Sequence, residues 1–98
     1  MSQTEIRQDV LDPIIRKNYK WLCESEMAVK TDDDTVRAMG AAFMSLVDYA
    51  KETGNVIDPE KDDMLPYAKA AAKTLAGILP GKDSMEWEEI FLREVDRY

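Results

Sequence analysis

The sequence contains no histidine and only one cysteine, Cys23. Without histidine, the chain lacks the usual general base near neutral pH and the commonest metal ligand. A single cysteine excludes a disulfide within one chain and fits a reducing compartment better than secretion. We therefore do not expect ordinary hydrolase or metalloenzyme chemistry, and we expect Cys23 to be a small apolar filler rather than a reactive thiol.

Long apolar runs are also missing. No run approaches the roughly 18 residues that would indicate a membrane span, and the first stretch, MSQTEIRQDVLD, is too polar for a secretory signal. We expect a cytoplasmic protein that does not bind membranes. Its 98 residues predict a single domain covering residues 1–98.

The motifs of common enzyme sites are absent from the sequence as well. There is no glycine-rich phosphate loop, no Cys-x-x-Cys pair and no histidine dyad. The carboxylates are spaced like helix caps and exposed faces rather than like a catalytic acid pair. The sequence predicts no catalytic residue, no cofactor and no enzyme activity.

What the sequence does contain is helical periodicity, in four segments and without strand-like alternation. Asp12 and Pro13 are typical of a helix start, which predicts a helix over 13–28 and a bend from a short extra helix at 3–11. A second helix is predicted over 34–53, ended by Gly54. Its expected core stripe is Val36, Met39, Phe43, Leu46, Val47 and Ala50.

The alanine-rich stretch PYAKAAAKTLAGIL predicts a third helix over 66–79. Its start stays open, because Pro59 could begin a helix that Pro66 kinks. Asp83 and Glu86 have capping-box spacing, which predicts a fourth helix over 84–97. The predicted fold is all-α, a small bundle of four helices with or without the short N-terminal one.

Acidic residues outnumber basic ones by 20 to 13, a net charge of −7. Direct nucleic-acid binding is not expected, because phosphate would be repelled. The excess is concentrated in residues 31–66, with nine acids and three bases. Such a segment can serve solubility and helix capping, or it can attract a basic partner.

Neither acidic cluster of this segment, 32–34 or 58–63, matches the residue spacing of a calcium-binding loop. Counting from Asp32, the sixth and twelfth positions are Arg37 and Phe43 instead of glycine and glutamate, and the cluster at 58–63 fails in the same way. No metal site is therefore predicted. Capping by Asp33 or Asp34 accounts for one aspartate and leaves the others unexplained.

The C-terminal helix carries apolar residues on two sides, since Met85 and Leu92 lie away from the face of Trp87, Phe91 and Tyr98. The aromatic face is expected in the core, and the other side suggests a second contact. We therefore expect a non-enzymatic acidic protein-binding module, such as an adaptor, inhibitor or regulatory subunit, with a partner that has a basic surface. The alternatives are a homo-oligomeric structural component and an acidic nucleic-acid mimic that blocks a basic groove. The expected partner-binding residues are Asp32, Asp33, Asp34, Asp58, Glu60, Asp62, Asp63, Met85, Trp87 and Leu92.

Overall fold

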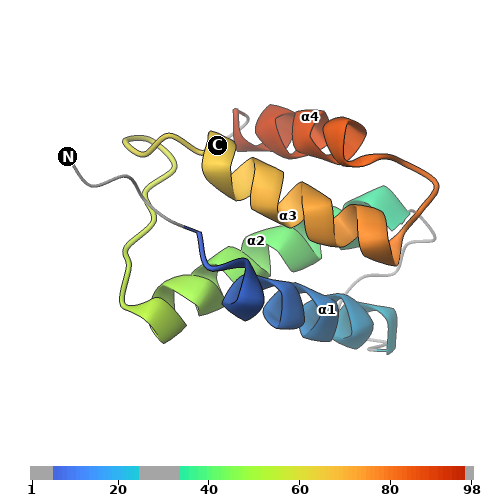
Figure 1. Cartoon of the computed structure of the whole chain (residues 1–98), viewed down its shortest axis with the longest axis horizontal. Helices are drawn as coiled ribbons and strands as arrows, with labels where there is room; N and C mark the ends of the chain where they lie inside the picture. The colour runs from blue at the N-terminus through green and yellow to red at the C-terminus, as the bar shows by residue number, and fades with distance from the viewer. Residues whose placement is uncertain (1–5, 25–33, 97–98) are drawn as a thin grey trace.

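A computed structural model of the chain describes residues 6–24 and 34–96. These residues form four helices and no strand, so the predicted all-α fold is confirmed. The helices are α1 (Gln8–Glu24), α2 (Asp34–Thr53), α3 (Leu65–Ile78) and α4 (Ser84–Val95) (Figure 1). None of the described helices is long and apolar enough to cross a membrane.

The helices pack as two pairs, α1 along α2 and α3 along α4. The pairs meet mainly through α1 and α3, whereas α2 makes little contact with α3 and still less with α4. A stacked pair of rings joins α2 to α4, since Phe43 and Phe91 have centroids 5.0 Å apart. In Figure 1 α2 and α4 diverge toward the end of α2. The bundle is therefore closed on its α1–α3 side and more open on its α2–α4 side.

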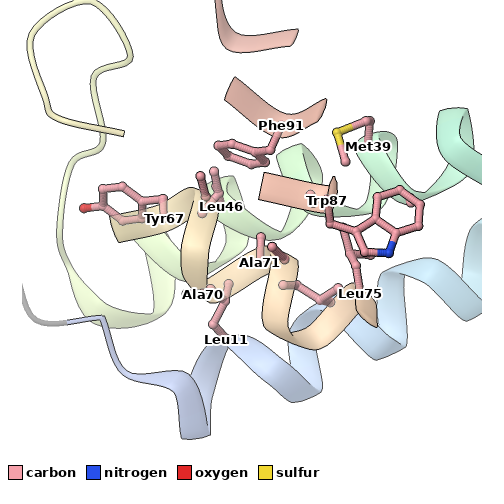
Figure 2. Close-up of a cluster of buried hydrophobic side chains, with 14 of the residues drawn as sticks. Leu11, Met39, Leu46, Tyr67, Ala70, Ala71, Leu75, Trp87 and Phe91 are labelled. Carbon is pink, nitrogen blue, oxygen red and sulfur yellow. The ribbon is translucent and has the colours of Figure 1, made fainter. Parts of the chain in front are cut away.

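The core lies between the two pairs (Figure 2). Alanines on three sides of α3 are buried, which lets the neighbouring helices approach closely. Larger side chains from all four helices fill the remaining space. The largest that are fully buried are Trp87, Tyr49, Phe91, Leu11, Ile15 and Leu75.

The start of α1 differs from the prediction. The helix begins at Gln8 and continues through Pro13, so residues 8–11 form its first turn and not a separate short helix. Gln8 holds this turn against α3, because its Nε2 donates to Thr74 Oγ1 at 2.9 Å and to the Ala70 carbonyl at 3.1 Å. Asp12 is not a cap but accepts from Thr74 Oγ1 at 2.9 Å. These tertiary bonds offset the backbone bond that proline removes.

Polar side chains also join α1 to α2. Asn18 is buried and donates to Ser45 Oγ at 2.9 Å and to Asp48 Oδ2 at 3.1 Å. Ser45 in turn donates to the Ala41 carbonyl. The buried Asn18 amide therefore has hydrogen-bond partners, and these bonds fix which face of α2 meets α1.

The connection between α2 and α3 is a turn, which decides the alternative that the sequence left open. Gly54 has a φ of 76° and caps α2 as predicted. The Asp58 carbonyl accepts from Lys61 N and Asp62 N, but this turn does not continue as a helix. α3 begins at Leu65 with Pro66 in its first turn.

At the start of α4, Asp83 is the N-cap and accepts from the Glu86 amide at 2.9 Å, as the capping-box spacing predicted. Several other predicted positions lie outside the described residues, namely 3–5, 25–28, Arg97 and Tyr98. Cys23 is exposed, so the expectation that it fills the core is wrong.

Because Tyr67 is buried, we expect the free energy of unfolding to fall at alkaline pH. Its burial, the charge of Asp62 and nearby Tyr49 raise its pKa above the ordinary value of 10.0. The pKa of Tyr67 is thus higher in the folded than in the unfolded chain. Its contribution to the free energy of unfolding is therefore complete below about pH 10 and is lost as pH rises through the folded-state pKa. Between about pH 9 and about pH 11, the urea midpoint should fall more in wild type than in Tyr67→Phe. Equal losses in the two proteins would contradict this assignment.

Candidate functional site

The site begins with the orientation of α2, which differs from the predicted stripe. The face that packs into the bundle holds four small residues and three large ones: Ala38, Ala41, Ala42 and Ser45, with Met39, Leu46 and Tyr49. Met39 and Leu46 are therefore buried as predicted. Val36 and Val47, expected in the core, are 49% and 56% exposed. The Asn18–Ser45 bond and the close packing that alanine allows turn the small residues toward α1. Val36, Met44 and Val47 are thereby left exposed on the outer side of α2.

This outer side forms one wall of an open groove of about 550 Å³. The other walls are the 54–64 connection that follows α2 and the last residue of α4, Val95. The lining residues are Phe43, Leu46, Val47, Ala50, Lys51, Gly54, Asn55, Val56, Ile57, Pro59, Met64 and Val95.

The groove is apolar and accessible. Lys51 and Asn55 are the only lining residues with strongly polar side chains. Val56 is 88% exposed, and it lies at the edge of the groove with Val47. The volume lies within the roughly 300–1,000 Å³ typical of ligand pockets. Such a surface can bind apolar side chains or an apolar ligand, because both would be removed from water there.

The predicted acidic residues lie beside this groove, at the start of α2 or outside the described part. Asp32 and Asp33 belong to the residues that the structure does not describe. Asp34 is exposed at the first position of α2 and pairs with Arg37. It therefore lies at the opposite end of α2 from the groove.

The cluster at 58–63 is the acidic group next to the groove, since Ile57, Pro59 and Met64 of the same connection line it. Three of its aspartates accept bonds from backbone amides: Asp58 from Glu60 at 3.0 Å, Asp62 from Asp58 at 2.8 Å, and Asp63 from Leu65 at 3.0 Å. These bonds shape the turn, as aspartates commonly do. Glu60 is exposed at the same turn.

The three predicted anchors on α4 have separate environments. Met85 is 71% exposed, whereas Trp87 is 1% exposed and belongs to the core, so Trp87 offers no surface to a partner. Leu92 is partly buried against the core. None of the three lines the groove, whereas Val95 of the same helix does.

Sequence reasoning missed the groove residues themselves. It assigned Phe43, Leu46, Val47 and Ala50 to the core, where Leu46 does lie and against which Phe43 packs, but it did not foresee that these residues also line a groove. It gave no role to Val56 and Ile57. One signal was present, because Val56 and Ile57 are an apolar pair inside an otherwise polar connection. A pair of that kind needs either a core contact or a partner.

Within residues 6–24 and 34–96, no group of three or more histidine, cysteine, aspartate or glutamate side chains could hold a metal ion. Comparison of the chain with protein-family models, curated proteins and solved structures gives no match.

Proposed function

We propose that this protein is a non-enzymatic binding module whose groove between α2, the 54–64 connection and the end of α4 takes apolar side chains of a partner protein. The observation that carries the proposal is the open apolar groove with Val47 and Val56 exposed at its edge. Contiguous exposed apolar surface is typical of interaction sites, because it is costly to leave in water.

The character of the lining supports binding rather than catalysis. Phe43, Val47, Val56 and Val95 offer contact area but no group that could transfer a proton or attack a substrate. Three acids of the nearby 58–63 turn are exposed, and its three aspartates accept from backbone amides. Carboxylates held in this way suit orientation of a charged partner. We place the module in the cytoplasm as part of the same proposal, because the exposed thiol of Cys23 fits a reducing compartment.

Valine-to-serine substitutions inside and outside the groove test the proposal. Val47→Ser removes an apolar contact at the groove edge, and Val36→Ser makes the same change on the same helix away from it. Partners captured from an extract of the source organism should bind Val47→Ser about 5- to 10-fold more weakly than wild type, because the lost contact is about half a valine side chain. Affinities measured by surface plasmon resonance check this.

Val36→Ser is the matched control and should bind like wild type. Both residues are about half exposed, so each substitution should change the free energy of unfolding by no more than about 0.5 kcal/mol. Partners that bind all three proteins equally well would contradict a role for the groove.

A further inference from the structure

We propose that the occupant of the groove is an amphipathic helix of another protein, with lysine or arginine beside its apolar stripe on the side that faces the 58–63 turn. This inference rests on the proposed function and names the class of partner.

The shape of the groove favours a helix. One wall is the side of α2, where Phe43, Val47 and Ala50 recur at helical spacing and form a ridge against which another helix can pack. The backbone groups inside α2 already bond within the helix, and the described residues contain no strand that a partner could extend. A segment that crosses this apolar surface must satisfy its own backbone groups, which a helix does.

The arrangement of the bundle leaves room for such a helix. α2 and α4 make little contact, and the Phe43–Phe91 ring pair joins them. The two helices diverge toward the end of α2 (Figure 1). The groove is lined there by the second half of α2 and by Val95 of α4. A fifth helix placed there would cover Val47 and Val56, the most exposed apolar side chains of the lining. Their burial would be favourable, because it removes apolar surface from water.

The charge of the neighbouring turn favours a basic helix. Asp58 to Asp63 holds four acids and one lysine, a net charge of −3. The aspartates are held in place by backbone amides, and their carboxylate oxygens have further acceptor positions. Lysine or arginine on the partner would meet fixed carboxylates, whereas an acidic helix would be repelled. The cation that lines the groove is Lys51, on the α2 side.

A second copy of the chain fits the groove less well. Of its described basic surfaces, α3 exposes Lys69 and Lys73 between buried alanines. The basic face of α1 has one large exposed apolar residue, Trp21, beside Lys17 and Lys20. One anchor does not fill a groove of about 550 Å³. The remainder of a second copy would also bring a charge of −7 against the first.

Synthetic helices can test the inference without a known partner. Four labelled peptides of about 18 residues, above the length at which isolated helices are marginal, would be titrated with the full chain and followed by fluorescence anisotropy. Three share a leucine stripe and carry lysine, glutamine or glutamate beside it, and the fourth scrambles the lysine peptide so that no stripe remains. The lysine peptide should bind about tenfold more tightly than the glutamate peptide, with glutamine between them and the scrambled peptide weakest. Its advantage should shrink between about 50 and about 500 mM salt.

Two charge reversals locate the effect on the protein. Glu60→Lys changes the turn beside the groove, at an exposed residue. It should weaken the lysine peptide about three- to fivefold and leave the glutamine peptide unchanged. Glu89→Lys makes the same change of charge on the exposed side of α4. It should weaken the lysine peptide less than Glu60→Lys does, and it should also leave the glutamine peptide unchanged.

The outcomes separate this inference from the proposed function. If the three stripe peptides bind equally and Val47→Ser weakens all of them, the groove binds but the basic partner is overturned. If no stripe peptide binds better than the scrambled one, the helical occupant is overturned. If sedimentation shows a dimer of the chain alone that Val47→Ser dissociates, the occupant is a second copy and the inference is wrong.

Discussion

Replacing Trp87 with alanine should lower the free energy of unfolding by about 3–5 kcal/mol, the range for removing a large aromatic side chain from a core. Trp87 is 1% exposed and lies in the cluster shown in Figure 2. Its indole nitrogen is buried and has no hydrogen-bond partner, so the loss comes from apolar contacts and from the cavity left behind. Urea titration followed by far-ultraviolet circular dichroism measures the effect.

Met85→Ala is the matched control, because it shortens an apolar side chain on the same helix that is 71% exposed. It should change the free energy of unfolding by no more than about 0.5 kcal/mol. Equal losses for the two variants would contradict the assignment of Trp87 to the core and Met85 to the surface.

Replacing Ala71 with leucine should lower the free energy of unfolding by about 1–3 kcal/mol, because extra carbon atoms in a filled core force its neighbours apart. Ala71 is fully buried on α3, and Figure 2 shows it in the middle of the labelled side chains. A larger side chain there would push α3 away from the helices that pack on it. The same urea titration measures the loss.

Ala50→Leu is the control for Ala71→Leu. Ala50 lines the open groove, so the added atoms meet free space instead of packed neighbours. The free energy of unfolding should change by no more than about 0.5 kcal/mol. A loss as large as that of Ala71→Leu would contradict the presence of the groove.

The fold could be predicted from the sequence wherever caps, a terminating glycine or helical periodicity alone determine the structure. The cap at Asp83, the glycine that ends α2 at Gly54 and the periodicity of four segments predicted most of the helices. The start of α1 could not be predicted in this way. Gln8 donates to Thr74, 66 residues away in the sequence, and Asp12 accepts from Thr74, 62 residues away. These bonds extend the helix past a proline that locally suggests a start.

The groove was beyond prediction for a related reason. Periodicity shows that α2 has apolar residues on one broad side, but the choice of the buried part depends on its neighbours. Buried Asn18 meets Ser45 and brings the small residues of α2 inward, which leaves Val36 and Val47 outside. The acidic turn was recognised from the sequence, whereas its place beside an apolar groove appears only in three dimensions.

The most direct test of the binding site is a titration of isotope-labelled protein with the lysine-flanked helix, followed through the amide chemical shifts. The largest changes should fall on Val47, Ala50, Val56 and Val95, which line the groove from three parts of the chain. Changes centred on the basic face of α1, or on the acidic turn without the apolar lining, would contradict the account.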